Sequence, residues 1–348
     1  MPFVSQLEPE SLLAQFLAHP PEGFAVQVAP SGMPTFRAPY DLLTTADDAV
    51  RRRVAGLPLY RHWGRLLRWR TRFAGCTATE YAPLPAQVPP AELAQELKTV
   101  FGRDCALLVV KDLAHDSPLL DAASNAHADA VAAACVERGF VLLEGMGLAW
   151  VPIDFASTDD YLARLSPGRR KDIRRKLRAR AGLEIGCLPT GAAFADEALL
   201  AQCYALFRNV HAQSEIQFDL PTAAFFRALL QDAGSGGKVF TYRHGGELIG
   251  WNLCYEFAGK LVDKYVGFAY PQAREHNLYF VSWMHNLEHA RERGLSHYVA
   301  GWTDPQIKRY LGATLSFTRH AVYLRNPLLR MLLRRLARHF EGEARRYG

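Results

Sequence analysis

Residues 238–268 read KVFTYRHGGELIGWNLCYEFAGKLVDKYVGF. Three segments rich in β-branched and aromatic residues follow one another here, at 238–243, 247–256 and 260–268. Only short breaks at Gly245-Gly246 and Ala258-Gly259 separate them, and glycine readily adopts the left-handed backbone of a tight hairpin turn. The stretch therefore predicts an antiparallel meander of three strands.

The segments on either side of the meander predict a mixed α/β domain. Helical periodicity marks residues 196–212 and 222–232 before the meander and residues 277–293 after it. Strands are expected at 183–188, 297–300 and 315–324, with a helical turn at 305–311. We expect a largely antiparallel sheet flanked by helices.

The first half of the chain also mixes helices and strands. Strands are expected at 24–29, 105–111 and 140–144, and helices at 11–19, 90–101 and 126–139. Residues 60–72 mix arginines with three large aromatic residues, which is typical of a surface for single-stranded nucleic acid or tRNA. A packed amphipathic helix whose arginines reach solvent explains the same pattern, and we favour that interpretation.

The densest charge lies between the two halves. Residues 161–180 read YLARLSPGRRKDIRRKLRAR, and from Arg169 to Arg180 eight basic residues accompany one acid. Ser166 followed by Pro167 is a helix-start signal. Such a basic helix indicates an anionic partner: nucleic acid, a phosphorylated cofactor or an acidic protein. A solvated face whose arginines pair with nearby acids is the alternative.

Composition excludes several classes of protein. Apolar residues make up 49% of the chain and charged residues 22%, as in a soluble globular protein, and no apolar run predicts a membrane-spanning helix. No signal-peptide pattern opens the chain, so we expect a cytoplasmic protein. The six cysteines lack disulfide-like or metal-like spacing, so no metal site is expected. Residues 327–346 predict a basic amphipathic helix that packs on the body or, less favoured, on a membrane surface.

Two ordered groups of motifs carry a resemblance to a known family. The first is Tyr161-Leu162, Leu165-Ser166, Arg170-Lys171 and Ile173-Arg174-Arg175, and the second is Glu288, Ala290, Gly294-Leu295, Gly301, Lys308 and Gly312. Across residues 155–330 the chain resembles the FemAB-like acyltransferases with two GNAT domains, including the peptidoglycan-biosynthesis-like group. The resemblance implies tandem GNAT-like domains: a degenerate one at 1–155, a basic linking helix at 156–182, an acyltransferase domain at 183–325 and a C-terminal helix at 326–348.

The resemblance also implies a reaction. An acyl or aminoacyl group would pass from a CoA thioester, an acyl-carrier protein or an aminoacyl-tRNA to an amine on a small molecule or peptide. The amine would attack directly, and no cofactor would be bound permanently. Such a site needs a phosphate cradle, a donor for the oxyanion and a base for the amine. A GNAT-like protein that binds tRNA or other nucleic acid without catalysis is the alternative.

The connection at 269–277 departs from the family pattern. Acetyl-CoA-dependent relatives have a glycine-rich turn there, whereas this sequence reads AYPQAREHN. The tight turn that lets the backbone approach a pyrophosphate is therefore missing. Arg274, Asn277 and the basic-helix residues Arg170, Lys171 and Arg174 are the candidates for binding donor phosphates. The departure favours a large donor, an aminoacyl-tRNA or a carrier-protein thioester.

The meander supplies candidate catalytic and substrate-binding residues. Side chains of a strand alternate between faces, so Asp263 and Tyr265 are expected to share one face. A carboxylate in an apolar strand has either a catalytic role or a structural ion pair. Glu256 ends the preceding strand and is a second catalytic candidate, while Asn252 and Tyr265 are expected to bind substrate.

The segment after the meander supplies further candidates. Lys308 occupies the position of the family's lysine and is expected to be catalytic, with a capping ion pair to Asp304 as the alternative. Trp302 and Thr303 follow the end of a strand and are expected to line the substrate site.

Two isolated residues complete the candidates. His276, at an expected helix start, suits a neutral general base. Glu215 lies in the loop between two helices, which borders the acceptor in this family, and is expected to contact the acceptor.

Overall fold

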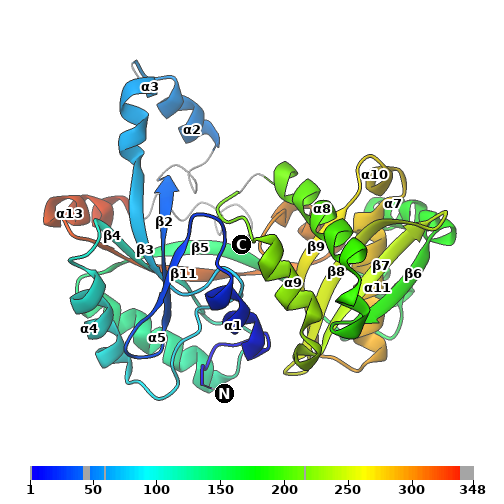
Figure 1. The fold of residues 1–348 in the computed structure, drawn as a ribbon, viewed down its shortest axis with the longest axis horizontal. Coiled ribbons are helices and arrows are strands. Elements are labelled where there is room, and N and C mark those ends of the chain that lie inside the picture. Colours follow the sequence, from blue (N-terminus) through cyan, green and yellow to red (C-terminus); the bar gives the residue numbers. More distant parts are fainter. Residues whose placement is uncertain (1, 42–47, 59, 215–216, 338–348) are drawn as a thin grey trace. The chain divides into compact units, whose positions relative to one another are not determined.

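A computed structural model of the chain describes residues 2–41, 48–58, 60–214 and 217–337 (Figure 1). Within them the chain divides into two compact units. Residues up to 6, 20–147 and 316 onward form the first unit, and residues 7–19 and 148–315 form the second. Each unit thus combines segments that are distant in sequence, while the predicted domain boundaries stay a prediction.

The first unit is built on a mixed sheet. Its strands are β1 Ala25–Val28, β2 Pro34–Asp41, β3 Arg68–Ala74, β4 Leu107–Leu113, β5 Val141–Pro152 and β11 Thr314–Leu324. The spatial order is β1-β2-β3-β4-β11-β5, with β3 parallel to β4 and the pairs β1–β2, β2–β3 and β4–β11 antiparallel. The helices are α2 Asp48–Ala55, α3 Tyr60–Trp63, α4 Pro90–Phe101, α5 Ala122–Glu137 and α13 Pro327–Leu336, and a 3-10 turn spans Gly64–Leu67.

The second unit has a sheet of the same kind. Its further strands are β6 Glu184–Pro189, β7 Gly237–His244, β8 Glu247–Phe257, β9 Lys260–Phe268 and β10 His297–Gly301. The order is β5-β10-β9-β8-β7-β6, and only β9 and β10 are parallel. The helices are α1 Glu10–Ala18, α6 Thr158–Ala163, α7 Pro167–Leu177, α8 Glu197–Gln213, α9 Ala223–Gln231, α10 Gln272–Glu275, α11 Leu278–Glu292 and α12 Pro305–Leu311; 3-10 turns span Arg178–Gly182, Ala192–Ala195 and Ala233–Ser235.

Local sequence explains the elements of the second unit. The predicted meander is confirmed as β7, β8 and β9, and its turns use left-handed backbone at Gly245, Gly246, Ala258 and Gly259. The carboxylate of Asp196 caps the first amides of α8, and the hydroxyl of Thr222 caps α9. The mixed, largely antiparallel sheet flanked by helices is the predicted fold class.

The two units share one plan. In the first, the antiparallel pair β2–β3 leads through α4 to β4, parallel to β3, and then to α5 and β5. In the second, the pair β8–β9 leads through α11 to β10, parallel to β9, and then to α12 and β11. The last strand of each series pairs with a strand of the other series. The strand β11 pairs with β4, and the second half of β5 pairs with β10. This repeat supports the tandem GNAT-like architecture.

Residues 60–72 differ from the helix we favoured. Only Tyr60–Trp63 is α-helical, a 3-10 turn follows, and Arg68 begins β3. Arg70 and Arg72 belong to the strand, where the ladder to β2 determines the backbone. Arg72 is buried and its guanidinium reaches the carboxylate of Asp104. Tertiary pairing therefore overrides the helical pattern.

Among the described residues, the structure has no helix that is both long enough and apolar enough to cross a bilayer.

Candidate functional site

The parallel strands β9 and β10 part shortly after they meet. Their pairing joins Lys260, Leu261 and Val262 to residues 297–299, and no further pair follows within the described chain. Ala300 is an extra residue against β5, and Gly301 takes left-handed backbone with φ of 77°. We call Asp263, Ala300, Gly301 and Lys308 the parting point. The edge of β9 that follows has no ladder partner on β10.

A bulge in β9 overturns one prediction about this strand. The register with β8 pairs Leu253 with Tyr265 but Cys254 with Asp263, so Lys264 is an extra residue. Asp263 and Tyr265 therefore point to opposite faces instead of sharing one. The ring of Tyr265 packs against aromatic rings of α8 and α9, with its centroid 5.1 Å from that of Phe226.

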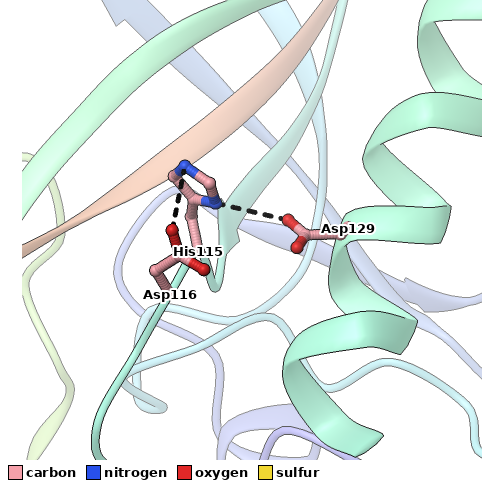
Figure 2. Close-up of side chains that lie close together, drawn as sticks. All are labelled: His115, Asp116 and Asp129. Carbon is pink, nitrogen blue, oxygen red and sulfur yellow. Dashed lines mark hydrogen bonds and ion pairs between the residues drawn. The ribbon is translucent and has the colours of Figure 1, made fainter. Parts of the chain in front are cut away.

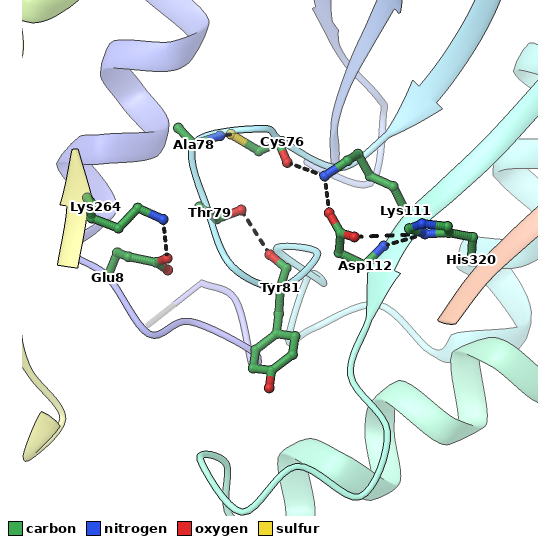
Figure 3. Close-up of polar contacts among 9 residues, drawn as sticks. All are labelled: Glu8, Cys76, Ala78, Thr79, Tyr81, Lys111, Asp112, Lys264 and His320. Atoms are coloured by element: carbon green, nitrogen blue, oxygen red, sulfur yellow. Dashed lines mark hydrogen bonds and ion pairs between the residues drawn. The ribbon is translucent and has the colours of Figure 1, made fainter. Parts of the chain in front are cut away.

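The extra residue is anchored by a buried ion pair. The ammonium of Lys264 lies 3.0 Å from a carboxylate oxygen of Glu8, and the two side chains are 6% and 0% exposed (Figure 3). Burying such a pair requires good geometry, because both charges lose their hydration. Glu8 belongs to the N-terminal segment of the second unit, so this segment fixes the bulge that orients Asp263.

Asp263 is held by uncharged donors on the α11 side of the sheet. The hydroxyl of Tyr298 donates to its Oδ2 at 2.9 Å and the amide of Asn286 at 3.0 Å, while Asn252 donates to Oδ1 at 3.3 Å. Burial raises the pKa of Asp263, and the hydrogen bonds from Tyr298 and Asn252 oppose that rise, as does the positive charge of Lys308. The carboxylate is thus fixed on the α11 side of the sheet, within the electrostatic influence of Lys308.

Asn286 and Tyr298 are members of this network that the sequence interpretation missed. Asn286 is fully buried on α11 among Trp283, Met284 and Leu287. A polar residue on the apolar side of a helix needs a hydrogen-bond partner, and this was the available signal. Tyr298 lies in an apolar strand and gives no comparable signal before its partners are known.

Lys308 is buried at the parting point. Its side chain lies on α12 and is 5% exposed, and its ammonium donates to the carbonyl of Ala300 at 2.6 Å. A Cβ on Gly301 would lie 3.9 Å from both the Lys308 ammonium and the Asp263 carbonyl oxygen, which places these groups together. The lysine thus binds the carbonyl of the bulged residue.

The structure brings Asp263, Asn252 and Lys308 together but places Glu256 elsewhere. Glu256 pairs in register with Leu261, where β9 and β10 are still joined. Its carboxylate accepts from His289 at 2.8 Å and from Arg293 at 3.3 Å. Burial raises the pKa of Glu256. The hydrogen bonds from His289 and Arg293 and the positive charges of Lys238 and Arg293 lower it by more, so the pKa lies below its ordinary value.

The remaining substrate candidates lie near the surface. Trp302 is partly buried and Thr303 is exposed, in the loop from β10 to α12. Glu215 lies outside the described residues.

The segment that replaces the glycine-rich turn forms the short helix α10. The amides of Arg274 and Glu275 bind the carbonyl of Pro271, and those of His276 and Asn277 bind carbonyls of Gln272 and Arg274. Four consecutive amides are therefore used within the segment. A short helix thus stands where the sequence predicts that no tight phosphate-binding turn forms.

The three polar candidates of this segment have separate surroundings. Arg274 donates to Gln213 at 2.7 Å, and its guanidinium lies over the Tyr270 ring. His276 follows α10 instead of starting a helix, and its ring centroid lies 4.1 Å from that of His244. Asn277 precedes α11 in left-handed backbone and makes no side-chain cap.

The basic helix α7 and the 3-10 turn after it contain some residues that are held by hydrogen bonds or ion pairs and others that form no ion pair within the described chain. Ile173 is its buried residue, and Arg169 donates to the last carbonyls of α12. Ion pairs involve the following residues: Arg174 with Asp159, Arg175 and Lys176 with Asp172, and Arg180 with Glu288. Within the described chain, Arg170, Lys171 and Arg178 form no ion pair. They line an open surface depression of about 460 Å³ along the helix.

The two motif groups of the sequence contact each other. The hydroxyl of Tyr161 donates to the carbonyl of Leu311, and a Cβ on Gly312 would lie 2.6 Å from that hydroxyl. Glu288 accepts from Arg180 and from Thr158. These motif residues hold α6 and α7 against α11 and α12, and so they support the segment that carries Lys308.

One cluster in the first unit has metal-ligand residue types. The imidazole of His115 lies between the carboxylates of Asp116 and Asp129, as Figure 2 shows, with possible ligand atoms within 4.8 Å of one another. However, Asp129 also pairs with Arg319, and the His115 and Asp116 side chains are 45% and 86% exposed. The cluster therefore gives no support for a metal site.

The first unit has its own parallel pair, but a lysine bridges it. Pairing of β3 with β4 ends at Ala74 and Val110. Directly afterwards, Lys111 donates to the carbonyl of Cys76 at 2.9 Å and contacts Asp112, whose amide donates to His320 (Figure 3). Side chains therefore occupy the place that corresponds to the parting point.

Comparison with known proteins agrees with this architecture. Residues 167–309 match the family described as an acetyltransferase (GNAT) domain. Residues 167–309 thus form a domain similar to GNAT acyltransferases. The match extends from α7 to α12, and it confirms the family predicted from the motifs between Tyr161 and Gly312. No curated protein matches the chain.

Solved structures share the fold across nearly the whole chain. The C-terminal domain of a putative lysylphosphatidylglycerol synthetase from Agrobacterium fabrum is 12% identical, with a TM-score of 0.53 over 89% of this chain and 86% of that one. L-PGS from Bacillus licheniformis is 10% identical, with a TM-score of 0.53 over 96% of this chain and 98% of that one. At these identities the likeness shows the fold alone.

Proposed function

We propose that the second unit transfers an acyl or aminoacyl group to an amine at the parting point of β9 and β10. The observation that carries the proposal is the buried ammonium of Lys308, which lies where the ladder between these strands ends. Where two neighbouring strands separate, an extended ligand can form hydrogen bonds with the backbone between them. The acyl arm of a donor would pair with β9 beyond Val262 and bring its carbonyl to Lys308.

Lys308 has the charge that the reaction requires. When the amine nitrogen bonds to the acyl carbon, negative charge develops on the acyl oxygen. The bond from that carbon to the carrier oxygen or sulfur then breaks, and a proton of the amine ends on the leaving group. A fixed ammonium in a water-poor environment stabilises this oxyanion more than it stabilises the neutral carbonyl. We assign this role to Lys308 and a positioning role to Asp263, Asn252, Asn286 and Tyr298.

The first unit is proposed to be non-catalytic. The side chain of Lys111 bridges its parallel pair, and a Cβ on Gly75 would lie only 2.8 Å from Lys111 Cγ. A donor arm would have to displace a buried charged contact to enter there.

An aminoacyl-tRNA is the donor that these features favour. The backbone amides of residues 274–277 bind carbonyls of their own segment, which weakens the case for a pyrophosphate of free CoA. Arg170, Lys171 and Arg178 form no ion pair within the described chain and provide positive charge on α7 and the 3-10 turn that follows it, which suits a phosphate backbone. One structure of the same fold is described as the C-terminal domain of a putative lysylphosphatidylglycerol synthetase, and that name also denotes attachment of an amino acid.

A donor panel tests the proposal. Purified protein is incubated with a mixture of amine acceptors and with either acetyl-CoA or total tRNA charged with labelled amino acids. We expect labelled amide products from the charged tRNA and far less product from acetyl-CoA. Efficient transfer from acetyl-CoA would refute the tRNA donor but keep the transferase. Salt-sensitive tRNA binding without transfer from either donor would support a nucleic-acid-binding protein instead.

A further inference from the structure

The C-terminal helix α13 packs with its polar side inward. Arg330 faces the rest of the first unit: its guanidinium lies 4.7 Å from the centre of the Tyr323 ring. A Cβ on Gly139 would lie 3.6 Å from the Arg330 guanidinium and 3.9 Å from that of Arg334. Gly139 directly follows the carboxyl end of α5, where the helix dipole favours positive charge. This explains why the arginine side is the docked one.

The apolar side of α13 is consequently exposed. Leu328, Leu329, Met331 and Leu332 are 69%, 40%, 49% and 50% exposed. Within the described residues, these four make up half of the large apolar side chains that are exposed to this degree. Soluble surfaces do carry single exposed leucines, but a cluster on one short helix indicates a binding surface. Leu328, Leu329 and Leu332 therefore do not pack on the body, and residues 338–346 of the predicted helix lie outside the described residues.

We propose that α13 binds an anionic lipid surface. The helix contains three arginines between Pro327 and Leu336 and no acidic residue. Arg335 is exposed and adjoins the apolar side, so leucines can enter the acyl region while the arginine meets lipid phosphates. A second copy of the chain is a poorer partner, because a symmetric contact would bring two acid-free, arginine-rich helices together.

The attachment is peripheral. A ten-residue helix is too short to span a bilayer, and the side chains would reach only the headgroup boundary. The asparagine cap at Asn326, which accepts from the amides of Leu328 and Leu329, keeps the helix formed with its leucines exposed. This proposal does not depend on the acyl-transfer proposal, because α13 shares no residue with the parting point.

Vesicle flotation of the full chain tests the proposal. We expect the protein to float with vesicles of phosphatidylcholine and phosphatidylglycerol, to bind pure phosphatidylcholine weakly, and to dissociate at high salt. The double variant L328E/L332E should bind at least about tenfold more weakly. The matched control is V100E, which adds one charge at another exposed apolar position of the first unit, 42% exposed on α4, and should bind like the wild type.

Three flotation results would overturn the proposal, and one light-scattering result would do so as well. The first is no flotation with anionic vesicles, and the second is equal binding to neutral ones. The third is undiminished binding by L328E/L332E, provided that its circular dichroism and thermal unfolding match the wild type. Light scattering covers the rival occupant: a dimer that L328E/L332E abolishes would identify a second copy as the partner and refute the lipid proposal.

Discussion

At the scale of single residues, burial decides which charges organise the molecule. Glu8 and Lys264 form an ion pair with almost no solvent exposure, whereas Glu197 and Arg227 form one on the surface. Removal of one partner from a buried pair leaves an uncompensated charge, while a surface charge remains hydrated. The buried pair also holds the residue that creates the bulge beside Asp263.

Glu8→Gln is therefore expected to lower the free energy of unfolding by about 3–5 kcal/mol. The double variant Glu8→Gln/Lys264→Met should recover part of this loss, because it removes both charges. Urea unfolding of the full chain measures the changes, and Glu197→Gln serves as the control that leaves stability nearly unchanged. An equal and small effect of Glu8→Gln and Glu197→Gln would show that the buried pair does not organise the bulge.

The sequence predicted which residues belong to the candidate site better than it predicted which face of the sheet their side chains lie on. The apolar surroundings of Asp263 singled it out, and the family position singled out Lys308. Strand alternation then failed for Asp263 and Tyr265, because the extra residue Lys264 shifts the register, and nothing in the local sequence marks a bulge. Asn286 was detectable from its apolar helix face, but Tyr298 was not.

At the scale of elements, α7 is a helix held in place by its own charges. Asp172 accepts from Lys176, Arg175 and Tyr310, and these bonds hold the pKa of Asp172 below its ordinary value near 3.8. Since Tyr310 lies on α12, this carboxylate joins α7 to the helix that carries Lys308.

Asp172→Asn should destabilise the chain by about 1–2 kcal/mol at neutral pH. A carboxyl group with a lowered folded-state pKa stabilises the fold above its ordinary pKa, and that stabilisation disappears as the pH falls through the folded-state pKa. The difference between wild type and variant should therefore shrink in acid. Urea midpoints of wild type and variant, measured from neutral pH to below the ordinary pKa of 3.8, give this difference in stability. A difference that does not depend on pH would contradict an ionic role of Asp172.

The basic residues without an ion pair on α7 and the following 3-10 turn make a separate prediction within the described chain. Replacement of Arg170, Lys171 and Arg178 by glutamine should weaken tRNA binding and reduce the slope of log affinity against log salt by about 2–3. The control is Arg52→Gln/Arg53→Gln, which removes exposed charge from α2 in the first unit. If both sets of substitutions change the slope equally per charge, α7 is not the specific tRNA surface.

Prediction of elements succeeded where patterns were local. The meander, α8, α9, α11 and β10 follow from alternation, periodicity and glycine turns within a few residues. The strand β3 was missed because its arginine-rich pattern makes sense only beside β2 and β4, which are distant in sequence. The helix α10 was missed because it is only four residues long.

At the scale of the whole molecule, two copies of one plan have diverged. Both contain a parallel strand pair that parts, yet the sequence shows no repeat by which the relation could be recognised. In the first unit Lys111 bridges the strands, and in the second unit Lys308 binds the carbonyl of Ala300 beside the open strand edge. We therefore expect a single catalytic unit that is supported by a structural one.

The most direct test compares these two lysines. Single-turnover transfer from charged tRNA to an amine is measured for the wild type, Lys308→Met and Lys111→Met, after tRNA binding and circular dichroism establish that each variant is folded. Loss of one oxyanion donor predicts a rate about 10²–10³-fold lower for Lys308→Met, with Lys111→Met close to the wild type. Full activity of Lys308→Met, or loss of activity only in Lys111→Met, would contradict the assignment of catalysis to the second unit.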